Sequence, residues 1–327
     1  MALPTARLGT TDMRITRVGF GAWAAGGSWA YGWGPQDDEE SITAIRHAVD
    51  QGVNWIDTAA VYGLGHSEKI VAMALQGVSD RPYVFTKCGM TWDDYGNVFR
   101  VATPTTIRRE VEESLRRLQA ERIDLYQVHQ TPEDGTPTAM YWETMAELRQ
   151  EGKVRAIGLS NHSALRLGQA EQIAHVDTLQ PAFSLIDRTA APELDWCTRH
   201  GTGVIVYSPM QSGLLTGAFS RERVAALAED DWRRRSPDFT IGLDANLALA
   251  DALRPVAERH GVSPAAVAVA WTLTWPGVTG AIVGARRPGQ VDGWLPAAAL
   301  ELTREDLEEI TAAMERTCAG RGPLRPR

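Results

Sequence analysis

Four side chains with complementary chemistry stand at the ends of short apolar runs in the sequence: Asp57, Tyr62, Lys87 and His129. Hydride reduction of a carbonyl needs an acid for the developing alkoxide, and a phenol with a pKa near ~10 is a weak one at neutral pH. A neighbouring ammonium lowers the pKa of a phenol, and a carboxylate keeps that ammonium charged. The set predicts Tyr62 as general acid, tuned by Lys87 and Asp57, with His129 orienting the carbonyl oxygen.

The elements that must position these side chains alternate along the chain: short apolar runs, and longer segments of helical period. This alternation is typical of βαβ units and a parallel sheet. Eight strands are expected, at residues 18–21, 54–57, 83–87, 123–129, 154–160, 178–180, 204–208 and 279–283. We therefore predict an α/β protein that forms a single (β/α)8 TIM barrel domain over residues 1–327. An N-terminal β-hairpin at 7–16 is expected to precede the first barrel strand. Barrels of this kind place their active sites at the carboxyl ends of the strands.

Two connections and the C-terminal tail depart from the regular alternation. Residues 88–103, after the third expected strand, and 210–244, after the seventh, are longer than ordinary loops, so we expect both to cover the active site. Residues 319–327 are rich in Pro, Arg and Gly and predict a poorly ordered tail.

The composition narrows the class of protein. The chain has 327 residues, 44% of them hydrophobic, and a net charge of −8, which disfavours nucleic acid as the main partner. No stretch approaches the ~18 apolar residues of a membrane span, and residues 1–12 lack a signal-peptide pattern, so we expect a cytoplasmic protein. Three scattered cysteines indicate reduced thiols and no structural metal. The basic run at 233–235 is interpreted as solvated surface.

The four polar residues and their surroundings resemble the aldo-keto reductase superfamily. The chain carries Asp-Thr-Ala-x-x-Tyr-Gly at 57–63, followed by a strand-end Lys87 and a strand-end His129. Within the superfamily it is most similar to bacterial NADP-dependent reductases of the general-stress type, through the motifs at 19–23, 157–161, 231–239 and 284–290. The resemblance covers residues 7–315 and implies reduction of aldehydes or ketones with NADPH.

The same resemblance implies where the cofactor binds. Ser160, Asn161 and Gln180 are expected to hold the nicotinamide carboxamide, and Tyr207 to stack on its ring. The segment 208–217 is expected to follow the pyrophosphate, and Arg286 to bind the 2′-phosphate, with Gln290 near the adenine. The remaining expected contacts are Gly21, Ala22, Trp23, Asp57, Ser208, Pro209, Met210, Gln211, Ser212, Gly213, Leu215, Gly217, Gly284 and Ala285. Arg287 either joins them or faces solvent.

Aromatic residues in the expected front loops predict the substrate pocket. Trp23, Trp29, Trp33 and Trp92 are expected to line it together with Tyr62 and His129, and such walls suit a bulky apolar or aromatic carbonyl. The alternative is that some of these tryptophans only cap the barrel. Cys88 lacks an evident activating base and is expected to be a packed thiol.

Two other functions remain open from the sequence. The barrel also resembles the cofactor-binding β-subunits of potassium channels, which would make it a regulatory subunit. A phosphate-binding isomerase or aldolase would instead use Lys87 as a Schiff-base amine. Neither the natural carbonyl nor the direction of reaction follows from the sequence, and a monomer and a small homo-oligomer are both compatible with it.

Overall fold

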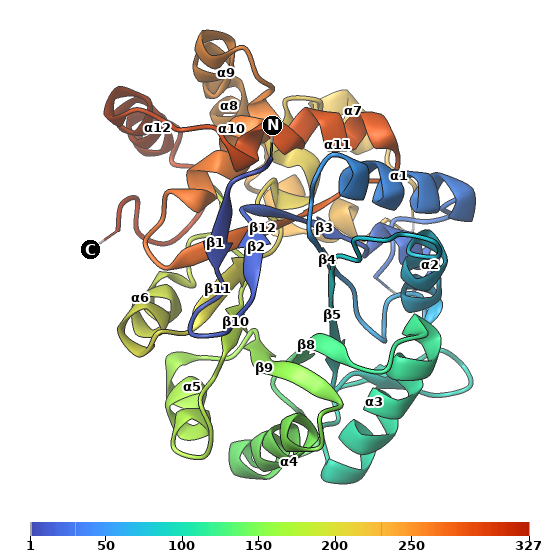
Figure 1. The fold of residues 1–327 in the computed structure, drawn as a ribbon. Coiled ribbons are helices and arrows are strands. Elements are labelled where there is room, and N and C mark those ends of the chain that lie inside the picture. Colours follow the sequence, from blue (N-terminus) through green and yellow to red (C-terminus); the bar gives the residue numbers. More distant parts are fainter. Residues whose placement is uncertain (1, 30, 230, 327) are drawn as a thin grey trace.

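Eight parallel strands close into a barrel in the computed structural model, which describes residues 2–29, 31–229 and 231–326. The strands follow one another around the barrel in chain order, and the last pairs with the first. They are β3 (Val18–Gly21), β4 (Trp55–Asp57), β5 (Tyr83–Cys88), β8 (Ile123–Val128), β9 (Val154–Ser160), β10 (Thr178–Gln180), β11 (Gly203–Val206) and β12 (Val278–Gly284). The predicted (β/α)8 fold class is confirmed (Figure 1).

Helices surround the barrel and cover the outer face of its strands (Figure 1). The first begins as the sequence predicts, with acids in its first turn and the Asp37 side chain accepting a hydrogen bond from the Glu40 amide at 2.9 Å. The helices are α1 (Asp38–Asp50), α2 (His66–Ala74), α3 (Pro104–Leu118), α4 (Thr138–Gln150), α5 (Ala164–Glu171), α6 (Ala191–His200), α8 (Leu243–Ala252), α9 (Arg254–His260), α10 (Pro264–Leu273), α11 (Pro288–Trp294) and α12 (Arg304–Thr317).

The barrel interior is a packed core closed at one end by the hairpin β1 (Thr5–Arg7) and β2 (Arg14–Thr16). Trp55 fills much of the interior, and its indole donates to the Thr16 carbonyl at 2.9 Å. Gly19 makes room for it, because a Cβ there would lie 2.1 Å from the indole ring. Packing at this end leaves the carboxyl ends of the strands as the open end of the barrel.

The two long connections have structure of their own. Residues 88–103 contain the hairpin β6 (Thr91–Trp92) and β7 (Val98–Phe99). The strap, defined as residues 208–242, carries η2 (Gln211–Thr216), α7 (Arg221–Ala225), η3 (Trp232–Arg235) and η4 (Pro237–Phe239). Short helical turns also occur as η1 (Ala24–Gly26) and η5 (Leu295–Ala298).

Residues 319–326, the described part of the tail that the sequence predicts to be poorly ordered, contact the rest of the molecule. Arg321 pairs with Asp187 at 2.6 Å and Asp238 at 3.3 Å, and Arg188 donates to the Pro323 carbonyl at 3.0 Å. The Pro, Arg and Gly content suggested disorder, but ion pairs to the loop after β10 and to the strap hold the segment. Residue 327 lies outside the described residues.

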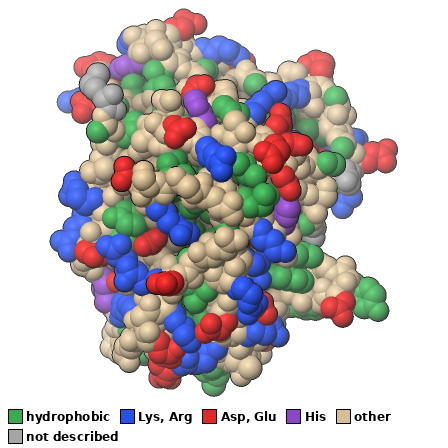
Figure 2. All heavy atoms as spheres, turned by 45° about the vertical axis from the view of Figure 1, so that its right-hand side comes forward, with side chains coloured by type: hydrophobic (Ala, Val, Ile, Leu, Met, Phe, Trp, Pro, Cys, Tyr) green, Lys and Arg blue, Asp and Glu red, His purple; other side chains and the backbone are tan. Residues whose placement is uncertain are grey.

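The surface carries charges of both signs. Acidic and basic side chains are interspersed over the face shown in Figure 2. Among the helices that the structure describes, none is long and apolar enough to cross a membrane.

Candidate active site

The four predicted catalytic side chains lie together at the open end of the barrel. Asp57 ends β4, Lys87 is the penultimate residue of β5, and His129 directly follows β8. Tyr62 belongs to the turn after β4, where its amide donates to the Ala59 carbonyl. Adjacent parallel strands therefore supply the residues, as expected for a barrel enzyme.

A buried ion pair forms the centre of this group. Lys87 Nζ donates to Asp57 Oδ1 at 2.6 Å and to the Thr58 carbonyl at 2.8 Å, and it lies 3.4 Å from Tyr62 Oη. Gln180 Nε2 donates to the second oxygen of Asp57 at 2.8 Å. The ammonium thus has three oxygen partners, and both carboxylate oxygens are bonded, which compensates the desolvation of two buried charges.

The environment of Tyr62 contradicts the prediction that Lys87 lowers its pKa. The pKa of Tyr62 is raised well above its ordinary value, first by burial and second by the charge of Asp57. The main physical reason is burial of the phenol, and Lys87 also lies closer to Asp57, at 2.6 Å, than to Tyr62 Oη, at 3.4 Å. Tyr62 therefore stays protonated at neutral pH, the form that a proton donor requires.

His129 faces Tyr62 across the site as a neutral imidazole. The ring centroids are 5.6 Å apart with the planes at 75°. Burial lowers the pKa of His129 well below its ordinary value, and the charges of Lys87 and Arg100 lower it further. Its ring has no hydrogen bond to any residue that the structure describes, so one N–H is available to a ligand oxygen.

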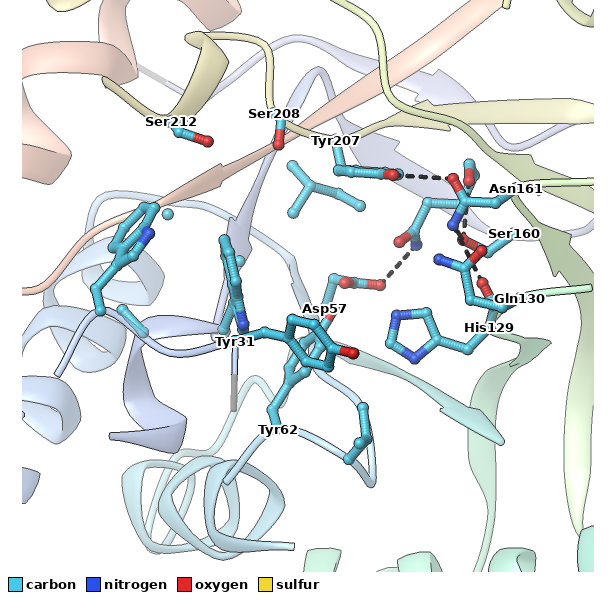
Figure 3. A pocket seen from close by; sticks show the side chains of 18 of the residues that line it. Tyr31, Asp57, Tyr62, His129, Gln130, Ser160, Asn161, Tyr207, Ser208 and Ser212 are labelled. Carbon is cyan, nitrogen blue, oxygen red and sulfur yellow. Dashed lines mark hydrogen bonds between the residues drawn. The ribbon is translucent and has the colours of Figure 1, made fainter. Parts of the chain in front are cut away.

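Asp57, Tyr62 and His129 form the floor of a cavity of about 370 Å³, and Lys87 is buried beside them without lining it. Figure 3 shows Tyr62, Asp57 and His129 converging on it, with Ser208 and Ser212 on the opposite side. The lining residues are Gly21, Trp23, Ala24, Trp29, Tyr31, Trp33, Asp57, Val61, Tyr62, Met90, Arg100, His129, Gln130, Ser160, Asn161, Gln180, Tyr207, Ser208, Pro209, Met210, Ser212, Gly213, Trp232, Ile282 and Gly284.

The residues predicted to hold a carboxamide form one hydrogen-bonded group (Figure 3). Tyr207 Oη donates to Asn161 Oδ1 at 2.9 Å, which fixes the tyrosine ring along the cavity wall. Asn161 Nδ2 donates to Ser160 Oγ at 3.0 Å and to the His129 carbonyl at 3.1 Å. Amide and hydroxyl groups held in this way can exchange hydrogen bonds with a planar amide, and an aromatic face can cover a flat ring.

The backbone at this site is unusual. In the described part of the chain, four of the seven non-glycine residues with positive φ are Asn161, Ser208, Gln211 and Ser212. Such conformations are costly and tend to cluster at ligand sites. Gly284, on the same wall, would have a Cβ no closer to its surroundings than the Gly21 carbonyl at 3.5 Å, so glycine there leaves cavity space open.

Several predicted cofactor contacts do not line this cavity. Leu215 is fully buried in the core, and the carbonyl of Gly217 accepts from Arg254 at 3.0 Å. The left-handed turns at 211–213 redirect the chain, so Leu215 packs in the core instead of facing the cavity. The other predicted residues outside the lining are Ala22, Gln211, Ala285, Arg286 and Gln290.

Arg286 and Gln290 lie next to each other at the start of α11. The Arg286 amide donates to Gln290 Oε1 at 2.7 Å. The Arg286 side chain binds Gln36 Oε1 and the Pro35 carbonyl, so it joins the loop after β12 to the loop after β3 without a carboxylate partner. Arg287 is exposed. This end of the site offers one guanidinium and one amide beside a helix N-terminus.

Three of the four tryptophans predicted for the substrate pocket line this cavity. Trp23, Trp29 and Trp33 line the cavity, whereas Trp92 does not. Trp92 lies in the β6–β7 hairpin, where the Arg117 guanidinium sits 5.9 Å from its ring. The reason is local: β6 turns the residue toward α3 and away from the barrel axis.

Eight lining residues were not predicted from the sequence: Ala24, Tyr31, Val61, Met90, Arg100, Gln130, Trp232 and Ile282. All except Ile282, which belongs to β12, lie in loops that follow barrel strands, and this position is the only signal the sequence offered. Trp232 belongs to the strap and lies 6.3 Å, ring to ring, from Trp23. The adjacent Arg233, predicted as solvated surface, is only 15% exposed and lies over the Trp33 ring at 5.2 Å.

Neither buried thiols nor metal ligands compete for this site. Burial raises the pKa of the Cys88 thiol well above its usual range, so it is a packed thiol. The part of the chain that the structure describes holds no cluster of three or more His, Cys, Asp or Glu side chains able to bind a metal.

Comparison with known proteins places the chain in a family. The family model described as "Aldo/keto reductase family" matches residues 17–315. The chain is 36% identical over 312 residues to Aldo-keto reductase YhdN of Bacillus subtilis, covering 94% of this chain and 92% of that protein. It is 34% identical over 327 residues to the NADH-specific methylglyoxal reductase of Escherichia coli, covering 94% and 98%.

A solved structure agrees with these sequence relatives. The glycerol dehydrogenase AKR11B4 from Gluconobacter oxydans superposes with a TM-score of 0.89 at 38% identity, over 100% of this chain and 99% of that one. The family match, the relatives and the barrel with its polar floor lead to one conclusion. The chain belongs to the aldo/keto reductase family.

Proposed function

We propose that this protein uses NADPH to reduce aldehydes or ketones to alcohols, with Tyr62 as the general acid. The observation that carries the proposal is the juxtaposition at the cavity floor of a phenol held protonated and a neutral imidazole, 5.6 Å apart ring to ring. Two neutral N–H and O–H donors beside each other can both bond one carbonyl oxygen.

Each side chain then has a definite task. His129 donates a hydrogen bond that fixes the carbonyl oxygen, and Tyr62 gives its proton to the same oxygen as negative charge develops there. Lys87, at 3.4 Å from Tyr62 Oη, stabilises the tyrosinate that remains, while Asp57 holds Lys87 in place. The nicotinamide supplies the hydride that reaches the carbonyl carbon.

The residues present fit a nicotinamide cofactor. Tyr207 is fixed along the wall by Asn161, and the Ser160, Asn161 and Gln180 side chains offer donors and acceptors for a carboxamide. The strained backbone at Ser208 and Ser212 supports binding of an elongated ligand past β11. Arg286 supports NADPH rather than NADH, because its guanidinium supplies a cation for the 2′-phosphate. One relative, however, is named NADH-specific.

The names of the relatives favour small, oxygen-rich substrates. Methylglyoxal is a dicarbonyl, and oxidation of glycerol gives a hydroxylated carbonyl. The cavity volume of about 370 Å³ also has room for the aromatic carbonyls that the tryptophan walls predict. We therefore place both types in the test.

The experiment is a carbonyl panel followed through the absorbance of NADPH and, in parallel, NADH. Methylglyoxal, glyceraldehyde, benzaldehyde, a simple ketone and an aldose form the panel, and Tyr62→Phe is the matched control. We expect turnover with some members for the wild type and none for the control. If no carbonyl oxidises either cofactor, the proposed reaction is wrong.

The two alternatives from the sequence find less support. None of the relatives named above is a channel subunit, so a regulatory role has no specific observation in its favour. A Schiff base on Lys87 would require its ammonium to lose a proton beside the Asp57 carboxylate 2.6 Å away. Borohydride trapping of a substrate on Lys87 would revive that reading.

A further inference from the structure

One charged group in the cavity wall is not used by the proposed reaction. Among the lining residues that the structure describes, only Asp57 and Arg100 carry a fixed charge at neutral pH. Asp57 is 3% exposed at the floor and paired with Lys87. Arg100 follows β7, its side chain is 43% exposed, and it places a guanidinium at the rim of the cavity.

The guanidinium of Arg100 is held by a partner that can be displaced. Its Nη1 donates to Glu133 Oε1 at 2.6 Å, and the backbone of the two residues is joined by a 2.9 Å hydrogen bond from the Glu133 amide to the Arg100 carbonyl. Glu133 is 68% exposed, so its carboxylate can leave for water at little cost. The backbone bond keeps Arg100 in place when the side chains part.

Arg100 also retains unused hydrogen-bonding capacity. Its Nε and Nη2 have no acceptor among residues 2–29, 31–229 and 231–326, and a guanidinium matches a carboxylate through two parallel N–H donors. The side-chain amide of Gln130, which likewise lines the cavity and lies next to His129 in Figure 3, has no hydrogen-bond partner among the residues that the structure describes. The cation and the amide are on the side of the cavity where the carbonyl oxygen is bound.

We infer that Arg100 selects carbonyl substrates that carry a carboxylate, which replaces Glu133 on its guanidinium while the carbonyl binds at Tyr62 and His129. The inference rests on the proposed function and adds the substrate class: oxo-acids rather than the purely apolar carbonyls suggested by the tryptophans. Glu133 then acts as a competitor that keeps the empty site from presenting a bare cation.

The test compares acids with their neutral amides. The substrates are 3- and 4-formylbenzoate, 3- and 4-formylbenzamide, and succinic semialdehyde with its amide, because each pair differs mainly in charge. The variants are Arg100→Met, Arg100→Lys and Glu133→Gln. Arg108→Met is the matched control, since Arg108 also pairs with exposed glutamates but lies outside the cavity wall.

We expect kcat/KM for the acids to fall by about tenfold in Arg100→Met, with the amides changed little. Arg100→Lys keeps the charge without the two-pronged donor and should fall between. Glu133→Gln removes the competitor and should raise kcat/KM for the acids by roughly two- to threefold, an opposite sign that loop damage cannot give. The acid preference of the wild type should weaken with salt.

Three outcomes would overturn the inference. Equal losses of kcat/KM for acids and amides in Arg100→Met would show that Arg100 only joins two loops. A loss rather than a gain in Glu133→Gln would point the same way, and so would a wild-type preference for the amides. Failure of the proposed function is distinct, because then neither acids, amides nor methylglyoxal would oxidise NADPH.

Discussion

The floor and the rim of the cavity are built on different principles. At the floor, Asp57, Lys87 and His129 lie at or directly after the ends of neighbouring strands, and the ladder hydrogen bonds between β4, β5 and β8 fix their spacing. Tyr62 lies in the short turn directly after β4. The rim comes from loops: Trp33 after β3, Arg100 after β7 and Trp232 in the strap. Loop side chains hold one another through ring contacts and exposed ion pairs.

This difference separates the residues that carry out the reaction, at the floor, from the residues that select the ligand, at the rim. A proton must be delivered to one atom, so the floor needs positions fixed to fractions of an ångström, which paired strands provide. Substrates and cofactors vary, and loops can change residues without disturbing the barrel. We therefore expect substitutions at the floor to cost much for every substrate, and substitutions at the rim to cost less and selectively.

The largest effect is expected at the floor, from Tyr62→Phe. Removing the proton donor while keeping the ring should lower turnover by about 10²- to 10⁴-fold, the usual worth of a general acid. NADPH should still quench tryptophan fluorescence in this variant, because the cofactor contacts proposed above do not include the phenol. Single-turnover rates and a fluorescence titration check both parts. Substantial remaining turnover would remove Tyr62 from its role.

The second floor prediction concerns stability. Lys87→Met leaves the buried Asp57 carboxylate without its ammonium, and an uncompensated buried charge typically costs about 3–5 kcal/mol of unfolding free energy. Adding Asp57→Asn removes that charge, so the double variant should recover most of the stability but no activity. Urea unfolding gives the free energy of unfolding of the wild type, of Lys87→Met and of the double variant.

The control for this comparison is Arg108→Met, which breaks an exposed pair and should cost no more than ~1 kcal/mol. A Lys87→Met protein as stable as this control would show that the floor tolerates an unpaired carboxylate. Ion pairs at strand ends and ion pairs on the surface would then not differ in their contribution to the free energy of unfolding.

The sequence predicts the strand-borne part of the molecule well, for a physical reason. Strand ends of a parallel barrel converge whatever the loops do, so Asp57, Lys87 and His129 could be brought together from their positions after apolar runs. The extent of loop contacts could not be read in this way. Trp92 and Leu215 have suitable types but are turned away by a two-residue strand and by left-handed turns.

Electrostatics was also beyond the sequence. Lys87 was expected to lower the pKa of Tyr62, but burial of the phenol and the charge of Asp57 raise it, and the depth of that burial follows only from the fold. The environment of Arg233 could not be predicted either. It belongs to a basic run, yet it pairs with Asp231 at 2.6 Å and lies over the Trp33 ring. Charge runs indicate solvent only when no aromatic face lies within reach.

A third prediction moves to the far end of the cofactor site. If Arg286 binds the 2′-phosphate, Arg286→Ala loses a charged hydrogen bond worth roughly 1.5–3 kcal/mol and should weaken NADPH binding by about ten- to a hundredfold. NADH binding should barely change. The exposed neighbour gives the control Arg287→Ala, in which neither cofactor should be affected strongly. Titrating both cofactors into the wild type and the two variants gives the six dissociation constants.

The two failures of this prediction have different meanings. Equal losses for NADH and NADPH would show that Arg286 only joins the Pro35 and Gln36 loop to α11. Tighter wild-type binding of NADH would instead overturn the choice of cofactor, and the chain would match its NADH-specific relative.

The smallest effect is expected where the strap meets the loop after β3. Arg233 lies over the Trp33 ring at 5.2 Å and Trp232 packs near Trp23, so these contacts close the strap over the cavity. A cation over an aromatic ring is worth about 0.5–2 kcal/mol, so Arg233→Ala should speed NADPH release only about two- to thirtyfold and leave the chemical step unchanged. Arg235→Ala, at an exposed position of the same turn, is the control. Stopped-flow displacement of NADPH gives the release rates, and hydrogen exchange of residues 210–244 should slow when NADPH binds the wild type. Unchanged exchange would show that the strap is a fixed wall of the barrel, and the rim would then be as rigid as the floor.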